Sequence, residues 1–376
     1  MDNFEYQEAN QEENQETNQE VNQEANQEAN QEVNQVIEQK EVLKQWFPFS
    51  RLGLFYMSIL VGTNLIAMII MTAHSFHLSL SGTIQNGSVD LAEITQAVND
   101  MLARNMAWIM LIAYAITIPL CYLMVKAAPT YKAELKKWKL SKLLLFVMLA
   151  IGLMMLGNLV SQIMQILVGI ITGHQMTNPL DSILNADNIF GSIFMVVIIA
   201  PFVEEFLFRK VLIDRVRVYG DKVTILLSGI LFGLFHGNLF QVVYAMLLGM
   251  LLAYIYLKSG RIAYCIGIHM IVNIIGGALP LLLIRGIDLD AIAKMQVDKI
   301  MEVVPQMMGM GGIFFLEIGC LIATITVLVK FRKNIIFTPA AIEIPKEQQF
   351  KTIYLNTGMI LFVVACVLIF ITNAMA

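Results

Sequence analysis

The sequence predicts an all-α membrane protein, a polytopic bundle of about nine transmembrane helices that follows a disordered N-terminal tail. Hydrophobic residues make up 57% of the 376 residues and charged residues only 14%, with a mean hydropathy of +0.67. These values lie well outside the range of soluble globular proteins. Apolar runs long enough to cross about 30 Å of hydrocarbon recur from Leu52 onward, and Lys and Arg gather in alternate connecting segments.

The N-terminal tail, residues 1–45, consists largely of a four-residue repeat. Asn recurs at every fourth position from Asn10 to Asn34, and nearly every copy is followed by Gln-Glu. Such a segment cannot bury enough apolar surface to offset its ordering entropy, which predicts a disordered, cytoplasmic tail. It has neither the basic region nor the small-residue cleavage site of a signal peptide.

Nine apolar runs follow the tail, and each is interpreted as a membrane span. They lie near residues 52–73, 106–126, 143–171, 189–208, 223–240, 241–257, 262–284, 312–330 and 353–374. With the N-terminus inside, the internal segments hold 21 of the 25 Lys and Arg residues. The excess of positive charge on one side predicts a cytoplasmic N-terminus and an external C-terminus. We expect an integral protein of the plasma membrane.

Two adjacent carboxylates, Glu204 and Glu205, end the apolar run 189–203. An acid in the middle of a membrane helix costs about 2.5–3.5 kcal/mol on insertion scales, so a retained pair indicates a function. On a helix Glu205 and Arg209 are i and i+4, within ion-pair reach, whereas Glu204 lies about 100° round and lacks that partner. Glu204 is therefore predicted to be the acid that remains free to react.

Further polar side chains interrupt two later apolar runs. His236 follows Phe232 by four residues in one run, and Asn273 follows His269 by four in the next. Each pair points to one side of its helix. Three helices are thus able to direct Glu204, His236, His269 and Asn273 toward a common point inside the bilayer.

These three blocks resemble the CAAX-protease and bacteriocin-processing (CPBP, or Abi) family of intramembrane proteases, which includes the type II CAAX prenyl endopeptidases. The family signature is EExxxR, then FxxxH, then HxxxN, and here it reads Glu204-Glu205 with Arg209, Phe232 with His236, and His269 with Asn273. The resemblance covers residues 140–280. It divides the chain into the tail (1–45), an N-terminal transmembrane region (46–140), a protease domain (141–285) and a C-terminal transmembrane region (286–376).

Peptide hydrolysis requires an activated water, a stabilised oxyanion and a proton for the leaving amine. We expect Glu204 to deprotonate a water held jointly with His236, and His269 with Asn273 to donate to the oxyanion. Glu205 paired with Arg209 would fix the end of the helix. This assignment agrees with what the resemblance implies.

A metal site is the alternative chemistry. Glu204, His236 and His269 would supply three ligands to zinc or another divalent ion and leave a position open for water. The sequence lacks the HExxH helix of the usual zinc proteases, so no cofactor is favoured.

A different class of function also stays open. A membrane immunity or scaffold protein would only bind a partner, and a proton-coupled transporter would use the same Glu and His as a relay, although no inverted repeat is evident. The expected partners are the lipid bilayer and a peptide or membrane-protein substrate such as a prenylated tail, a bacteriocin precursor or a signalling peptide; nucleic acid is not among them. Other polar residues in the spans, Glu317 near the outer face and Asn158, Gln162 and Gln165, are interpreted as hydrogen-bonding between helices.

Overall fold

The computed structural model describes residues 47–81, 91–173, 189–285, 287, 294 and 297–375. The predicted N-terminal tail therefore lies outside the described residues. Within them every regular element is helical, and the chain folds as the predicted transmembrane bundle. The first helix is Phe47–Ser81. The main later helices are α2 (Leu91–Val125), α3 (Leu140–Thr172), α8 (Asp221–Phe235), α9 (Val242–Ser259), α10 (Ile262–Asn273), α13 (Val297–Phe331), α14 (Lys346–Tyr354) and α15 (Thr357–Met375).

The acid pair lies on one long helix, Ile189–Tyr219, that is not α-helical throughout. Two π-helical turns interrupt it, and in these turns each N–H bonds to the carbonyl five residues earlier. Its pieces are α5 (Ile189–Phe194), π-helix η1 (Met195–Ile199), α6 (Ala200–Glu205), π-helix η2 (Phe206–Ile213), α7 (Asp214–Val216) and 3₁₀-helix η3 (Arg217–Tyr219). A third π-turn, η4 (Ile274–Ala278), separates α10 from α11 (Leu279–Ile284). Turns of this kind are frequent at functional sites.

The number of spans differs from the expected nine at one place. Among the described residues, seven helices are long and apolar enough to cross a membrane, and an eighth results if Lys346–Tyr354 and Thr357–Asn373, which meet at 55°, form one span. The predicted span that does not meet this length is 223–240, which corresponds to α8. His236 caps α8 and Gly237 then takes a left-handed φ of 65°, so the helix has 15 residues and rises only about 22 Å.

The helix with the acid pair is longer than expected. The sequence ended this span at residue 208, but the helix continues to Tyr219 because buried partners hold its last turns. Arg215 donates to the carbonyl of Val125 at the end of α2 at 3.0 and 3.1 Å, and Tyr256 of α9 donates to Asp214 at 2.9 Å. Glu204 therefore lies farther from the helix end than the sequence indicates.

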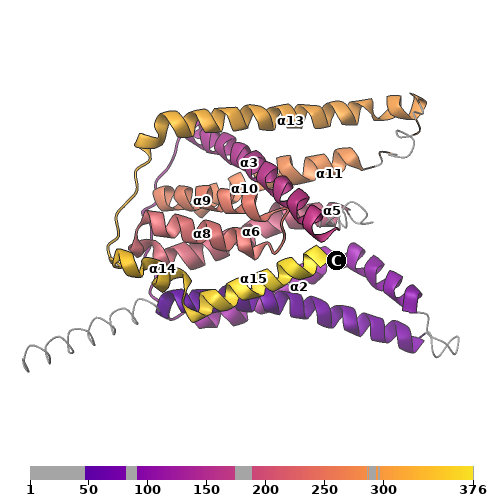
Figure 1. The fold of residues 1–376 in the computed structure, drawn as a ribbon, viewed down its shortest axis with the longest axis horizontal. Helices are drawn as coiled ribbons and strands as arrows, with labels where there is room; N and C mark the ends of the chain where they lie inside the picture. Colours follow the sequence, from indigo (N-terminus) through magenta and orange to yellow (C-terminus); the bar gives the residue numbers. More distant parts are fainter. Residues whose placement is uncertain are drawn as a thin grey trace, which may run out of the picture.

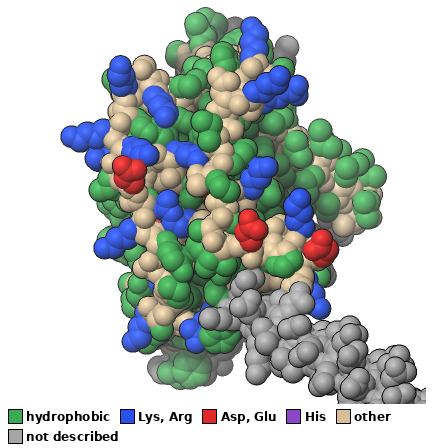
Figure 2. Space-filling model, turned by 90° about the vertical axis from the view of Figure 1, so that its left-hand side faces the viewer, with side chains coloured by type: hydrophobic (Ala, Val, Ile, Leu, Met, Phe, Trp, Pro, Cys, Tyr) green, Lys and Arg blue, Asp and Glu red, His purple; other side chains and the backbone are tan. Residues whose placement is uncertain are grey.

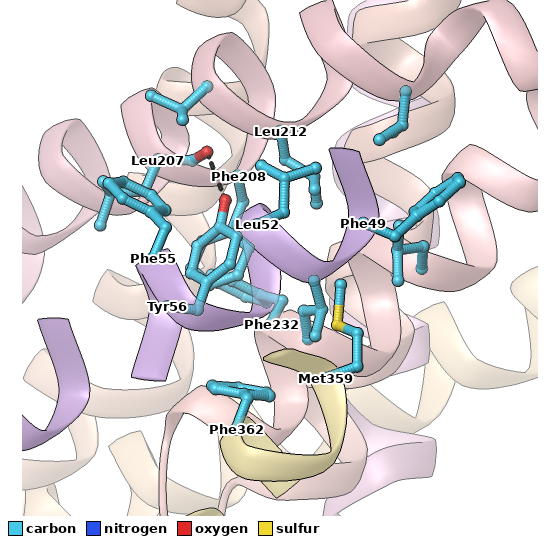
Figure 3. Packing of buried hydrophobic residues seen from close by; sticks show 14 of the residues in the cluster. Phe49, Leu52, Phe55, Tyr56, Leu207, Phe208, Leu212, Phe232, Met359 and Phe362 are labelled. Carbon is cyan, nitrogen blue, oxygen red and sulfur yellow. Dashed lines mark hydrogen bonds between the residues drawn. The ribbon is translucent and has the colours of Figure 1, made fainter. Parts of the chain in front are cut away.

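Two apolar cores lie on opposite sides of this helix. The first joins the first helix, η2, α8 and α15 (Figure 3), and includes Tyr56, Phe208 and Phe362. The second joins α3, α9 and α10. In the bundle, α6, α8, α9 and α10 therefore lie between α3 and α13 on one side and the first helix and α15 on the other (Figure 1).

Basic side chains gather at one end of the bundle, the end at the left of Figure 1. Figure 2 views this end face-on and shows many Lys and Arg side chains with few acids. Backbone hydrogen bonds bring its segments together: Lys136 donates to Ser259 at 2.8 Å, and Asp221 donates to Thr338 at 3.1 Å. The exposed cations on these segments include Lys132, Lys136, Lys137, Lys222, Arg332, Lys333 and Lys346. This is the charge distribution on which the predicted orientation depends.

Candidate functional site

The site is built on a helical hairpin that turns at Gly220. Gly220 joins the helix Ile189–Tyr219 to α8 with φ 91° and ψ 156°, a backbone conformation open essentially only to glycine. A side chain at this position would also lie within 3.0 Å of the backbone nitrogen of Ala340. Beside the turn, the hydroxyl of Thr224 donates to the carbonyl of Val216 at 3.1 Å. These residues stand four positions after and four before Gly220, which sets the register of the two helices.

The same register brings the first and second motifs to matching heights. The rings of Phe208 and Phe232, twelve residues on either side of Gly220, meet edge to face at 5.0 Å. Glu204 and His236 stand four residues farther along each helix, sixteen residues on either side of Gly220. A hairpin with a period of four therefore brings the EExxxR and FxxxH blocks together.

Glu205 and Arg209 form the ion pair that their spacing predicts. Arg209 Nε lies 2.7 Å from Glu205 Oε2 and Nη2 lies 3.2 Å from Oε1, and both side chains are completely buried. The remaining guanidinium nitrogen, Nη1, donates to the hydroxyl of Ser228 on α8 at 2.8 Å. The guanidinium group of Arg209 therefore connects η2 to α8 and also binds Glu205 through two nitrogens.

His269 lies between the two acids. Its Nδ1 is 3.0 Å from Glu205 Oε1, and its Nε2 is 3.8 Å from Glu204 Oε2. Because the carboxylate of Glu205 in the Arg209 ion pair can only accept, His269 must donate to it from Nδ1, which leaves Nε2 directed toward Glu204. Glu204 has no Lys or Arg partner in the described part of the chain. The structure thus separates a buried, paired acid from a second acid that faces an imidazole.

His236 reaches the site from the end of α8. Its Nδ1 lies 2.7 Å from the carbonyl of Phe232, so Nδ1 donates and Nε2 is left as an acceptor. The Phe232 ring lies against both histidines, at 4.9 Å from the His236 ring and 5.7 Å from the His269 ring. The ring of Tyr244 on α9 is 6.5 Å from the ring of His236, centroid to centroid. The ring of Phe232 thus packs against both histidines and keeps them apart.

Asn273 has a structural partner that the sequence did not indicate. In η1 the N–H of Ala200 bonds to the carbonyl of Met195, and the next residue, Pro201, has no N–H. The carbonyl of Val196 is therefore left without the main-chain donor that the π-register would supply. Asn273 donates to it from Nδ2 at 2.8 Å. This bond holds Asn273 beside α6 and leaves its second amide N–H for another acceptor.

Side chains also satisfy carbonyls in η2. The buried hydroxyl of Tyr56 donates to Leu207 at 2.8 Å, as the dashed line in Figure 3 shows, and the ring of Tyr56 stacks on Phe208 at 4.8 Å. Ser228 lies 3.5 Å from the carbonyl of Phe208. The first helix thereby supports the turn that carries Arg209, although it contains none of the three motifs.

Sequence reasoning missed Ser228, Tyr56, Tyr244 and the carbonyl of Val196. Ser228 had a weak signal, since it is a small polar residue within an apolar helix, eight positions beyond the Gly220 turn. The others gave no signal in the sequence, because Tyr56 and Tyr244 lie in apolar runs, where an aromatic residue is normally interpreted as a packing residue.

The alternative metal site can be compared with this geometry. Among the described residues, no group of three or more His, Cys, Asp or Glu side chains is placed to hold a metal ion. The expected ligands Glu204, His236 and His269 thus do not form such a set here. No step of the mechanism below runs through a metal.

Comparison with known proteins adds independent information on this segment. Residues 186–275 match a family model, Type II CAAX prenyl endopeptidase Rce1-like. The match includes all six predicted site residues and confirms the resemblance to the CPBP family. At the level of the family it supports a CAAX-type intramembrane protease. No curated protein and no solved structure matches the chain.

Proposed function

Because residues 186–275 carry an Rce1-like domain, we propose that this integral membrane protein is an endopeptidase that hydrolyses peptide bonds within the membrane, near its cytoplasmic face, with Glu204 as general base. One observation carries the proposal. Of two adjacent acids, Glu205 is bound to Arg209 and His269, whereas in the described part of the chain the one ionisable partner of Glu204 within 4 Å is the Nε2 of His269, at 3.8 Å. An acid that is not neutralised by a fixed cation can exchange a proton during a reaction.

Glu204 and His236 would hold the attacking water between them. With Nδ1 of His236 committed to the carbonyl of Phe232, its Nε2 accepts a hydrogen bond from the water, which keeps that hydrogen. Glu204 accepts the other and takes it as the water oxygen attacks the peptide carbonyl. Glu204 then delivers this proton to the leaving amine, so the water supplies both the hydroxyl of the new acid and the hydrogen of the new amine.

His269 and Asn273 would stabilise the oxyanion. Asn273 keeps one amide N–H after its bond to Val196. His269 donates from Nε2 only as an imidazolium, and the carboxylate of Glu205 supports that charge through Nδ1. With Glu204 and Glu205 ionised, the charges of Arg209 and His269 make the four-residue cluster neutral.

Glu205 and Arg209 are positioning residues in this scheme. Both are completely buried, and together they connect α6, η2, α8 and α10 through Ser228 and His269. Neither side chain would exchange protons, since each is held by a partner of opposite charge. Their contribution is to fix the imidazole of His269 relative to Glu204, where an error of about 1 Å would lower the rate about 10²-fold.

Purified protein in lipid nanodiscs provides the test. Membrane peptides that accumulate in cells carrying Glu204→Gln, but not in cells carrying the wild-type protein, would identify substrates among prenylated tails, bacteriocin precursors and signalling peptides. A synthetic copy of one such peptide should be cleaved by the wild-type protein and not by the Glu204→Gln variant.

Retained function of the Glu204→Gln variant in the cell, together with the absence of any cleaved peptide, would overturn the proposal. An immunity or scaffold protein would give that result. A proton-coupled transporter would instead lose uptake of its solute in Glu204→Gln while no peptide was cleaved in either protein.

A further inference from the structure

A second feature of the bundle is a cavity of about 450 Å³ that borders the proposed active site. It lies between α3, α9, α13 and the π-turn η4. Its polar wall comprises Asn158, Gln162 and Gln165 of α3, Glu317 of α13, and Tyr244 and Asn273.

The three amides of α3 face the cavity together. Asn158, Gln162 and Gln165 stand at i, i+4 and i+7, which places them on one side of the helix. The sequence suggested that they hydrogen-bond between helices, yet none of the three bonds to another side chain or backbone group in the described ranges. All three line the cavity, with Gln162 exposed and the other two half-buried, and so give it a polar wall beside apolar residues such as Met154 and Phe314.

Glu317 provides the charge on the opposite wall. It stands 20 residues from one end of α13 (Val297–Phe331) and 14 from the other. It is half-buried and has no Lys, Arg or His partner among the residues that the structure describes. A carboxylate within a membrane helix is costly unless a cation or water compensates it.

Close helix contacts on one side explain why the cavity opens on the other. A side chain at Gly152 would collide with Thr324 of α13, and one at Gly157 would collide with the backbone of Tyr244 on α9. Beyond Gly157, α3 runs away from α13 toward α5 (Figure 1). The large side chains of α3 that follow, such as Leu159 and Gln162, do not close the space.

Two residues belong to both the cavity and the proposed active site. Asn273 lines the cavity while it donates to Val196 beside α6. Tyr244 lines it, and its ring lies 6.5 Å from the ring of His236. A peptide held at Glu204 would thus have its neighbouring side chains beside this cavity.

We propose that the cavity between α3, α9, η4 and α13 is a specificity subsite that receives a Lys or Arg side chain of the peptide substrate, with Glu317 as its counter-ion. The inference rests on the proposed protease function and adds a substrate class to it. The amides of Asn158, Gln162 and Gln165 would hydrate or accept from the cationic group, and the carboxylate of Glu317 would neutralise it. A charged pair formed only with substrate also explains why no cation of the protein occupies this place.

Matched peptides test whether the cavity prefers a positively charged side chain. The wild-type protein in nanodiscs is given a substrate identified as above and copies in which each residue near the scissile bond in turn is Lys or the isosteric, uncharged norleucine. At one position we expect kcat/KM for Lys to exceed that for norleucine by about tenfold. Glu317→Gln should remove this preference with little change for the norleucine peptide, and Glu317→Lys should transfer the preference to a Glu peptide. Equal cleavage of all the peptides by the wild-type protein, or a Lys preference that persists in Glu317→Gln, would overturn the proposal.

Two glycines provide a steric test of the same site. Gly277 lines the cavity and a Cβ there would meet no atom within 4 Å, so Gly277→Leu should fill the space without a clash. Gly319 of α13 is exposed and equally open, which makes Gly319→Leu the matched control. We expect the first change to raise KM at least about tenfold and the second to leave it unchanged. If both variants keep the wild-type KM, the cavity is not a substrate subsite.

Failure of this inference differs from failure of the protease proposal. If no peptide is cleaved in a Glu204-dependent manner, the protease proposal fails and the subsite with it. If peptides are cleaved normally but Glu317→Gln instead abolishes proton uptake into vesicles, the cavity is a proton route and the subsite alone is rejected.

Discussion

His269 Nδ1 lies 3.0 Å from Glu205 Oε1, so the second acid of the pair orients the histidine that faces the first. This relationship predicts different outcomes for the two acids. Glu204→Gln should fold normally and lower kcat about 10²–10⁴-fold, the usual contribution of a general base. Peptide cleavage in nanodiscs measures the rate, and size-exclusion profiles establish folding. Cleavage that survives in Glu204→Gln would reverse the assignment of the two roles.

Glu205→Gln should act on folding as well as on activity. It leaves the buried guanidinium of Arg209 without its counter-charge, a loss of about 3–5 kcal/mol for a broken buried pair. We expect a lower melting temperature and less folded protein in detergent. The exposed pair of Lys136 and Glu134, at 3.0 Å, is the control: Lys136→Gln should cost only about 0–1 kcal/mol. Similar melting temperatures for the two variants would contradict the structural role of Glu205.

Asn273 and Pro201 should be energetically coupled through the carbonyl of Val196. Asn273→Ala leaves this carbonyl unpaired and should cost about 1–3 kcal/mol of stability. Pro201→Ala restores a main-chain N–H in the following turn, so the same Asn273→Ala change should cost less in that background. A double-mutant cycle on melting temperature or denaturant unfolding measures the coupling. Additive effects would mean that Asn273 does not replace the donor that Pro201 lacks.

Tyr56→Phe should destabilise the protein although it removes no residue of the three motifs. The change removes the buried hydrogen bond to Leu207 and should cost about 0.5–1.5 kcal/mol, since this carbonyl keeps its main-chain donor in η2. Tyr122→Phe is the control, since Tyr122 is exposed and its hydroxyl makes no hydrogen bond within the described residues. Thermal unfolding in the same detergent compares the two variants. An equal, small decrease in melting temperature for both would show that the Tyr56 hydroxyl does not stabilise η2.

Metal dependence stays a prediction. We expect peptide cleavage by folded protein to survive prolonged treatment with chelators, because Glu204 and His236 suffice to activate water in the proposed scheme. Metal analysis of the purified protein accompanies the assay. Stoichiometric zinc, with cleavage lost on its removal and regained on its return, would establish the alternative site of Glu204, His236 and His269.

The orientation in the membrane also remains to be measured. The Lys and Arg residues at one end of the bundle predict that this end is cytoplasmic (Figure 2). Reporter fusions after Lys142 should therefore report from inside, and fusions near Pro305 from outside. The opposite pattern would reverse the bundle and move the proposed cleavage site to the external face.

The sequence by itself determined the fold class, the motifs and one side-chain pair. Membrane helices follow from apolar length, because the bilayer forces the backbone to satisfy its own hydrogen bonds. The Glu205–Arg209 pair follows from the i, i+4 geometry of a helix, which holds wherever that helix is placed. The positions of Glu204 and His236 along the helical hairpin also follow from the sequence, since each residue lies sixteen positions from the turn at Gly220.

Tertiary structure alone decided what these residues touch beyond their own hairpin. The place of His269 between Glu204 and Glu205 depends on how α10 packs against α6, 64 residues away from Glu205 in sequence. The bond from Asn273 to Val196 depends on a π-turn, whose extra residue per turn leaves no mark in the apolar pattern. The cavity beside Glu317 likewise exists because α3 and α13 pack closely at Gly152 and then separate. Distances between helices are set by side-chain packing, which the periodicity of a single helix does not encode.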